Sequence, residues 1–100
     1  MSITEKSRRE KKRRYLRKLK AIEYKGGHCK ACGEDRLVAL CFHHREPSDK
    51  GFPLNVANLS MYGWDKVEAE LDKCDLLCHN CHHVLHYQDG WDQFLAAAQV

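Results

Sequence analysis

Apolar and polar side chains along the chain follow patterns that predict a mixture of helices and strands. Residues 5–24 contain no Gly or Pro and are rich in strong helix formers, so they are expected to form a long helix. The apolar residues of this helix share one stripe, made of Tyr15, Leu16, Leu19 and Ile22. We expect this stripe to pack on the body of the protein, and the polar first half of the helix to project into solvent.

The middle of the chain carries a strand and a loop. Two sets of apolar residues alternate along residues 36–43, which predicts a largely buried strand. This strand delivers His43 and His44 at its end, and Pro47 then interrupts the pattern. Residues 48–62 are rich in Gly, Pro and Asn and are expected to form a long loop. Loops of this length in a small domain are usually functional or flexible.

The rest of the chain predicts further helices around one short strand. A helix from about residue 64 to 73 is indicated by a shared apolar face of Trp64, Val67, Leu71 and Cys74. Residues 75–77 are expected to form a short strand, and residues from about 80 to 87 a helix. A short last helix follows, with an apolar side formed by Trp91, Phe94 and Leu95.

The overall composition is that of one small globular domain. The chain has 100 residues, of which 43% are hydrophobic and 31% charged, and a core of this size is marginal without additional cross-links. No apolar stretch is long enough to cross a membrane, and the polar, basic start of the chain lacks a signal-peptide pattern. We therefore expect a cytoplasmic protein with a basic arm in residues 1–24 and its main domain in residues 25–100.

The net charge of +3 is distributed unevenly. Residues 1–25 carry eleven Lys or Arg against three acids, a net charge of +8, whereas residues 26–100 carry six against eleven, a net charge of −5. Cations this dense repel one another unless a polyanion neutralises them, which favours nucleic acid as the partner over a simply solvated helix. The residues expected to contact nucleic acid are Arg8, Arg9, Lys11, Lys12, Arg13, Arg14, Arg17 and Lys18.

Four of the six cysteines form two Cys-x-x-Cys pairs. In an intracellular protein such pairs indicate a metal site more than a disulfide framework, and a redox pair would need a thioredoxin-like context that is missing here. Four thiolates complete a closed structural zinc site, which would tie the two halves of a small core together. The predicted zinc ligands are Cys29, Cys32, Cys78 and Cys81. Cys41 and Cys74 lack a partner at ligand spacing and are predicted to be small core residues.

Histidines next to the second cysteine pair indicate a second metal site. His82 and His86 lie four residues apart, so in a helix they project from one face and can hold one ion. The pair His43 and His44 at the end of the predicted strand can complete this site. A competing pair with the same helical spacing is His79 and His83.

Taken in their order along the chain, the cysteine pairs and the histidines resemble the motifs of the HNH endonucleases. The resemblance is to the small zinc-containing HNH proteins of bacteria and phages in particular. The segments that carry the resemblance cover about residues 22–88 and are Tyr24-Lys25-Gly26-Gly27, Cys29-x-x-Cys32-Gly33, Phe42-His43-His44 with Pro47, and Glu70-Leu71-x-x-Cys74-x-Leu76-Leu77-Cys78-x-Asn80-Cys81-His82-x-x-x-His86. The resemblance implies an α+β fold with a ββα-metal (His-Me finger) core, in which two strands and a helix clasp one divalent ion. To this core we add the structural zinc held by four cysteines, the basic N-terminal helix and the short C-terminal helix.

The resemblance also implies roles for individual residues. His44 matches the general base of the family, and His43 matches the metal ligand that precedes it. His82 and His86 match the metal ligands that follow the second cysteine pair. Lys73 stands where the family has its middle Asn, which orients the base. Either another side chain or a backbone carbonyl orients His44, or catalysis is weakened.

The implied function is metal-dependent hydrolysis of phosphodiester bonds in nucleic acid, with double-stranded DNA as the expected partner and low sequence specificity. Besides the structural Zn²⁺, this reaction requires one catalytic divalent ion, which is Mg²⁺, Mn²⁺, Ni²⁺ or Zn²⁺. The ion neutralises developing charge on the phosphate while a base deprotonates water. Two alternatives remain open: a catalytically weak, zinc-stabilised nucleic-acid-binding module, or a phage assembly or packaging accessory with a phage or bacterial protein partner.

Overall fold

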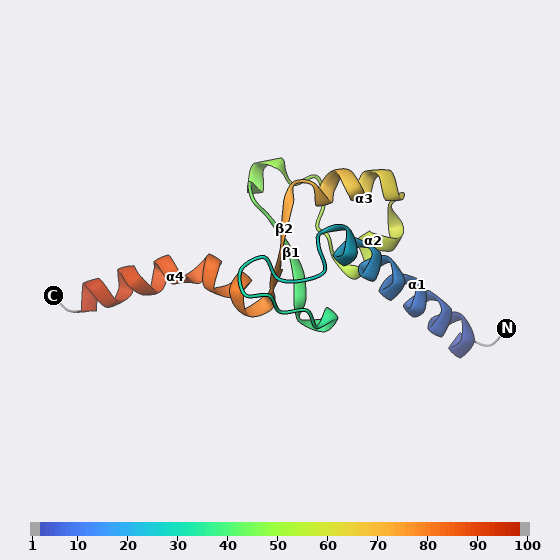
Figure 1. Ribbon diagram of the computed structural model, residues 1–100, viewed down its shortest axis with the longest axis horizontal. Coiled ribbons are helices and arrows are strands. Elements are labelled where there is room, and N and C mark those ends of the chain that lie inside the picture. The colour runs from blue at the N-terminus through green and yellow to red at the C-terminus, as the bar shows by residue number, and fades with distance from the viewer. Residues whose placement is uncertain (1–2, 99–100) are drawn as a thin grey trace.

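The computed structural model describes residues 3–98, which form a small α+β fold with two antiparallel strands and several helices (Figure 1). The elements in chain order are α1 (Ile3–Tyr24), a 3-10 turn η1 (Leu37–Ala39), β1 (Leu40–His44), a 3-10 turn η2 (Pro47–Asp49), α2 (Val56–Met61), α3 (Trp64–Leu71), β2 (Cys74–Cys78) and α4 (His79–Ala98). The predicted α+β class is confirmed. No helix within the described residues is both long and apolar enough to cross a membrane.

The two strands pair over their full length. Their antiparallel register runs from Leu40 opposite Cys78 to His44 opposite Cys74. The segment that connects them forms α2 and α3, whereas α4 begins at His79, directly after β2. The start of α4 therefore lies beside the strand pair, as Figure 1 shows.

The core consists of two apolar clusters. The cluster around the strands contains Ile22, Cys29, Leu40, Leu76, Leu77 and Cys78. The cluster around α2 and α3 contains Ala21, Leu59, Val67 and Leu71. Ala21 and Ile22 are neighbours in α1 yet belong to different clusters, and Phe42 packs against both. The last turns of α1 therefore join the clusters, and each large apolar side chain that is fully buried contributes about 1.5–3 kcal/mol.

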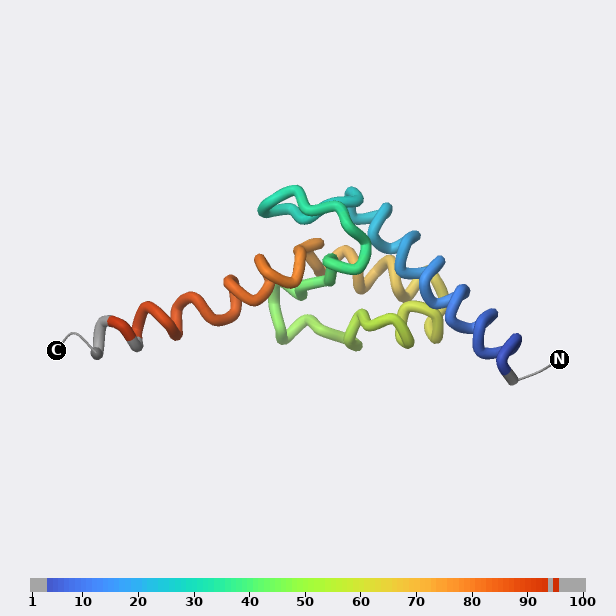
Figure 2. Tube along the Cα trace, turned by 90° about the horizontal axis from the view of Figure 1, so that it is seen from below, coloured from blue at the N-terminus to red at the C-terminus, as the bar shows by residue number. Residues whose placement is uncertain are grey.

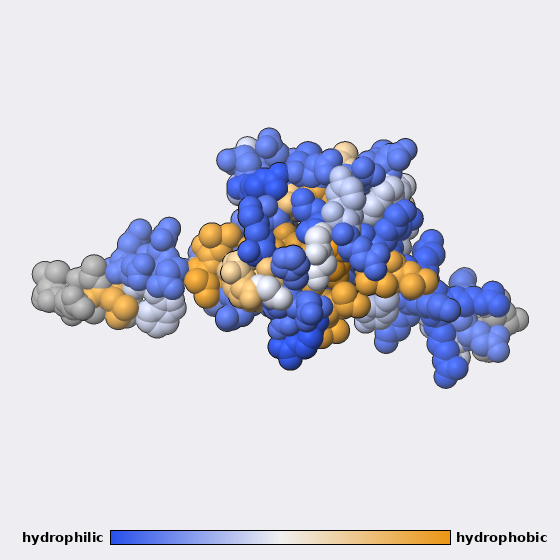
Figure 3. Space-filling view, in the orientation of Figure 1, coloured by the Kyte–Doolittle hydropathy of each residue, from blue (hydrophilic) through white to orange (hydrophobic). Residues whose placement is uncertain are grey.

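Two helices extend away from this core in opposite directions (Figures 1 and 2). The molecule measures 65 × 28 × 23 Å, and its radius of gyration of 16.8 Å exceeds the value of about 13 Å typical of a compact domain of this length. The first half of α1 projects into solvent, as predicted, and the second half of α4 extends from the other end. Figure 3 shows that the projecting part of α1 is predominantly hydrophilic.

The apolar stripe of α1 is only partly buried. Ile22 is buried and Leu19 is half-buried, but Tyr15 and Leu16 remain 53% and 55% exposed. The predicted packing of the whole stripe is therefore wrong for its first turn. The reason is that η1 reaches this part of α1 only as one wall of an open groove.

The predicted strand over residues 36–43 is correct only in its second half. β1 begins at Leu40, and η1 precedes it with Val38 80% exposed. Glu34 favours the turn, because its carboxylate accepts hydrogen bonds from the backbone N–H of Arg36 at 3.1 Å and from the Arg36 guanidinium at 2.5 Å. These bonds also lower the pKa of Glu34 to about 2. Such local contacts compete with an extended chain.

The predicted loop over residues 48–62 contains a short helix. α2 spans Val56–Met61, and the Asn55 side chain caps it by accepting a hydrogen bond from the Asn58 N–H at 2.8 Å. Leu59 is buried, so α2 covers one side of the second core cluster. The capping Asn55 is a sequence signal for this helix that the abundance of Gly and Pro obscured.

The two helices predicted after β2 are one. α4 continues through Gly90, where no neighbouring group interrupts it, and an internal glycine costs only about 1 kcal/mol relative to Ala. Trp91 and Leu95 are 60% and 49% exposed, so the predicted apolar side of a last helix does not pack into the core. The side chain of Phe94, assigned to the same apolar side, lies outside the described part of the structure.

Candidate metal centres

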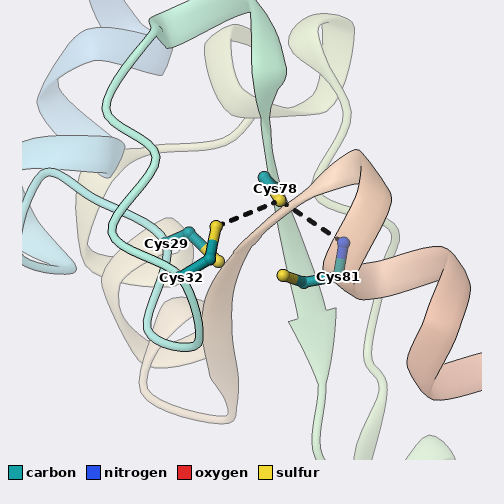
Figure 4. Close-up of side chains that lie close together, drawn as sticks. All are labelled: Cys29, Cys32, Cys78 and Cys81. Atoms are coloured by element: carbon teal, nitrogen blue, oxygen red, sulfur yellow. Dashed lines mark hydrogen bonds between the residues drawn. The ribbon is translucent and has the colours of Figure 1, made fainter.

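Four cysteine side chains from three segments converge beside the strands (Figure 4). Cys29 and Cys32 follow α1, Cys78 ends β2, and Cys81 lies in the first turn of α4. Their thiols are free, their sulfur atoms all lie within 4.8 Å of one another, and Cys32 Sγ is 3.7 Å from Cys78 Sγ. Four sulfurs placed tetrahedrally at about 2.3 Å from one zinc ion lie about 3.8 Å apart. The donor set and its spacing fit zinc, so the predicted four-cysteine cluster is confirmed.

Backbone contacts shape the first half of this cluster. The Gly33 N–H donates to the Cys29 carbonyl at 3.0 Å, and Gly33 adopts φ +83°, a left-handed conformation that favours glycine. The Lys30 N–H donates to the Leu76 carbonyl at 2.8 Å. The first cysteine pair is therefore fastened to β2, the strand that ends with the second pair.

The surroundings of Cys29 favour the thiolate, the form in which cysteine binds zinc, whereas the hydrogen bond with Cys78 raises the pKa of Cys81 to about 12. Burial raises the pKa of Cys29, but hydrogen bonds from nearby backbone groups, including those of Cys78 and Cys32, outweigh burial and lower this pKa to about 6. In the second pair, the Cys81 N–H donates to Cys78 Sγ at 3.3 Å, as Figure 4 shows. Donors aimed at sulfur stabilise its negative charge.

Three histidines form a second, separate cluster. It contains His43 from β1 and His82 and His86 from α4, with ligand nitrogens that all lie within 4.8 Å of one another. The Nε2 atoms of His82 and His86 are 2.9 Å apart, and the His43 ring lies 5.1 Å from both of their rings. Imidazole nitrogens bind zinc at about 2.0–2.1 Å, so nitrogens this close can share one ion. The structure brings together the three histidines that the sequence predicts as ligands.

The surroundings of His43 and His82 favour the neutral imidazole, the form that binds metal. Burial lowers the pKa of His43, and repulsion from a protonated His86 lowers it further. Burial likewise lowers the pKa of His82, with additional repulsion from His86 and His43. Protonation of several of these rings together is costly, because their charges repel one another. One metal ion bound by the neutral rings avoids this repulsion.

The competing histidine pair is not brought together. The His83 ring packs against Tyr87, with centroids 4.4 Å apart. His79 lines a pocket with Lys18 and Leu40 beside β1. Neither histidine belongs to a group of converging ligand atoms in the part of the chain that the structure describes.

His44 does not join the histidine cluster. Neighbouring residues in a strand project to opposite faces, so His43 faces α4 while His44 faces α3. The His44 side chain is only 9% exposed, and its Nε2 lies 2.6 Å from Glu70 Oε2. His44, the predicted base, therefore follows the predicted ligand His43 in sequence. Its ring, however, lies on the opposite face of β1, where it contacts Glu70 of α3.

Glu70 is a buried acid with three polar partners. Its Oε2 accepts a hydrogen bond from the Gly51 N–H at 3.0 Å, and its Oε1 accepts one from Lys73 Nζ at 3.1 Å. Lys73 Nζ also donates to the Asp49 carbonyl at 2.9 Å. Burial raises the pKa of Glu70, but the hydrogen bonds from Gly51, His44 and Lys73 outweigh burial and lower it. The carboxylate is therefore ionised at neutral pH.

The sequence pattern did not predict the contact between Glu70 and His44. The available signal is that Glu70 lies on the buried face of α3 between Val67 and Leu71, where an acid requires a partner. The partner could not be named from spacing, because His44 lies 26 residues earlier and comes from a strand.

The predicted nucleic-acid contacts lie along α1. The exposed members are Arg8, Arg9, Lys11, Lys12 and Arg13, and the half-buried members are Arg14, Arg17 and Lys18. Arg14 pairs with Glu10 at 3.3 Å, and the Arg17 guanidinium lies over the Trp64 ring at 5.7 Å. Most of the predicted cations on this helix are therefore accessible to a polyanion.

Comparisons with known proteins add no relative. No protein-family model, no curated protein and no solved structure matches the chain. The resemblance to the HNH endonucleases therefore rests on the motifs, and membership of that family stays a prediction.

Proposed function

We propose that this protein is a metal-dependent endonuclease that hydrolyses phosphodiester bonds of double-stranded DNA with low sequence specificity. The observation that carries the proposal is the convergence of His43, His82 and His86, whose ligand nitrogens lie within 4.8 Å of one another. The elements around this cluster are an antiparallel strand pair and the helix that follows it directly. This order supports the ββα-metal core that the HNH-like motifs imply.

The two clusters suit different tasks. Four thiolates saturate a tetrahedral zinc ion, so the four-cysteine cluster would close the fold and leave no position for a substrate. Three imidazoles leave positions open for water and phosphate oxygens. We therefore assign the catalytic divalent ion to the histidine cluster. Nitrogen ligands suit Zn²⁺ or Ni²⁺, whereas Mg²⁺ and Mn²⁺ prefer oxygen.

The proposed chemistry divides the work among the histidines. His43, His82 and His86 would hold and orient the ion, which when bound neutralises charge that develops on the phosphate. His44 would take the proton from the attacking water, a task for which imidazole is well suited. The resemblance implies products with 5′-phosphate and 3′-hydroxyl ends.

The basic helix α1 supports nucleic acid as the substrate. Its 22 residues span about 33 Å, and its exposed cations lie along the part that projects from the body. Contacts from such cations to phosphates contribute affinity but carry little sequence information. Low specificity follows from this mode of binding.

A second candidate function is a zinc-stabilised nucleic-acid-binding module without cleavage. The observation that favours it is the burial of His44, which is 9% exposed and has its Nε2 engaged by Glu70. In this alternative His44 and Glu70 serve the stability of the fold. The four-cysteine cluster and the basic helix would keep the same roles.

A plasmid-nicking assay separates the two functions. The zinc-containing protein is freed of loosely bound divalent ions by brief EDTA treatment, and single metals are then added back while zinc content is measured. Metal-dependent relaxation of supercoiled plasmid by the wild type and by His83→Ala, but not by His82→Ala, supports the endonuclease. Plasmid binding without nicking in every metal tested supports the binding module and contradicts the proposal.

A further inference from the structure

We infer that Glu70 is the positioning residue for His44 and that Lys73 and Gly51 hold Glu70 in place for this role. The inference rests on the proposed function, because it assigns Glu70 to the proposed cleavage reaction. Lys73 stands where the HNH-like motifs have an asparagine. Its Nζ donates a hydrogen bond to Glu70, which in turn lies 2.6 Å from His44 Nε2.

The contact with Glu70 distinguishes the two ring nitrogens of His44. Its Nε2 lies 2.6 Å from Glu70 Oε2. An ionised carboxylate can only accept hydrogen bonds, so in this contact Nε2 carries the hydrogen and donates it. In a neutral imidazole the other nitrogen then bears the lone pair. The contact therefore selects Nδ1 as the atom that can take a proton from water.

The polar partners of Glu70 hold its side chain in one position. The residue is 4% exposed, and both of its carboxylate oxygens are engaged by Gly51, Lys73 and His44. A buried carboxylate without such partners would be strongly destabilising. Rotation of this side chain would break at least one of these bonds. The carboxylate therefore fixes the direction of the His44 ring as well as its tautomer.

The Glu70 carboxylate occupies the space directly beside Gly51. A Cβ atom added at Gly51 would lie 2.8 Å from Glu70 Oε1, which is closer than real Cβ contacts. Gly51 does not have a positive φ, so its backbone accepts alanine without strain. The substitution Gly51→Ala therefore shifts the carboxylate while leaving its charge intact. It separates the position of Glu70 from its chemistry.

The test begins with the tautomer, which does not depend on activity. Nitrogen NMR of the histidine side chains is recorded on the full-length, zinc-bound wild type, and His44 is assigned with His44→Ala. We expect His44 to carry its hydrogen on Nε2 in the wild type and to show mixed tautomers in Glu70→Gln. A wild-type His44 with its hydrogen on Nδ1 overturns the inference, whatever the cleavage activity.

The second arm measures single-turnover plasmid cleavage. We expect Glu70→Gln and Gly51→Ala to lose about 100-fold in rate, toward the lower end of what a general base contributes. The affinities for DNA and for the divalent ion should stay at wild-type values, a split that a general loss of folding would not produce. The control is Glu68→Gln, which removes a carboxylate from the same helix and should cleave at the wild-type rate.

The outcomes distinguish the inference from the proposed function. If the wild type cleaves and both Glu70→Gln and Gly51→Ala cleave equally fast, the positioning role is wrong and the proposed function stands. If Glu70→Gln does not fold, Gly51→Ala alone decides. If the wild type cleaves no nucleic acid in any metal, the proposed function is wrong, and the positioning role falls with it.

Discussion

The Tyr24 hydroxyl donates a hydrogen bond of 2.5 Å to Asp72 and so joins the last residue of α1 to the residue that follows α3. The Tyr24 ring also meets Trp64 edge-on, with centroids 6.0 Å apart. Lys20 Nζ lies 4.1 Å from the centre of the same Trp64 ring. These contacts attach the end of α1 to α3 and add to the packing of α1 against α2 in the second core cluster.

We predict that Tyr24 titrates unusually late. The hydrogen bond to Asp72, with burial and charge repulsion, raises the pKa of Tyr24 from 10.0 to about 12. Because the folded pKa lies above the unfolded one, the stabilisation is fully present below about pH 10 and is lost as the pH rises toward 12. Ultraviolet titration should reveal a late tyrosinate signal that is missing in Tyr24→Phe. A wild-type titration curve with the same shape and midpoint as that of Tyr24→Phe would contradict the prediction.

Loss of one zinc ligand should destroy the fold. Binding of structural zinc contributes about 10–16 kcal/mol, which equals or exceeds the stability of about 5–15 kcal/mol in most small domains. Cys29→Ser and Cys78→Ser are therefore expected to lose zinc and to show no cooperative thermal transition. Cys41→Ser is the matched control, because Cys41 is a free thiol outside the cluster. Full zinc content in both ligand variants would rule out the structural role.

Metal binding at the histidine cluster should depend on His82 and His86 but not on His83. Removal of one imidazole from three is expected to weaken binding of a divalent ion by at least about 100-fold, more than the loss of an outer-shell partner. Calorimetric titration of Mn²⁺, Ni²⁺ or Zn²⁺ into the zinc-bound protein measures this effect. His83→Ala controls for removal of an imidazole from the same helix. Loss of binding in His83→Ala with retention in His82→Ala would show that the ligands are misassigned.

Replacement of His44 should separate catalysis from metal binding. His44→Ala is expected to lower the cleavage rate by about 10²–10⁴-fold, the contribution of a general base. Its affinity for the divalent ion should stay near that of the wild type, because His44 is not among the converging nitrogens. Cleavage and calorimetry on the same preparation test both parts. Undiminished cleavage would remove His44 from the mechanism.

Deletion of residues 1–14 should weaken DNA binding across sequences. These residues contain seven Lys or Arg, which are Lys6, Arg8, Arg9, Lys11, Lys12, Arg13 and Arg14. For every phosphate that the shortened protein no longer neutralises, the slope of log affinity against log salt is expected to fall in magnitude by about 0.9. Binding measured at several salt concentrations gives the slope, while cleavage at saturating protein should persist. An unchanged slope would assign α1 to another task.

The sequence predicted both ligand clusters because short-range spacing encodes them. The x-x between Cys78 and Cys81 closes one turn, and the four-residue step from His82 to His86 keeps both side chains on one helical face. His43 could be added because it ends a strand. The local geometry of these residues depends little on the rest of the chain. The spacing alone also allowed a competing histidine pair, which the structure does not bring together within the residues it describes.

The features that the sequence did not predict depend on contacts between distant segments or on competing local bonds. Glu70 meets His44 only because α3 folds back against β1, and the pattern of neither segment specifies that contact. At η1, hydrogen bonds from Arg36 to Glu34 prevailed over an alternating pattern typical of a strand. At Gly90, a helix continues where the sequence favours a break, because one internal glycine costs only about 1 kcal/mol relative to Ala.

Adjacent positions in the first turn of α4, Cys81 and His82, serve different clusters. One residue inserted between them would rotate the following helix by about 100° and turn His82 and His86 away from His43, while the four thiols kept their places. The segment between β1 and β2 carries the Glu70 contacts and most of the second core cluster, so it tolerates changes of length only in the loop positions outside these contacts. Divergent descendants of this chain would therefore keep the distance from Cys78 to His86 invariant and confine insertions and deletions between the strands to those loop positions.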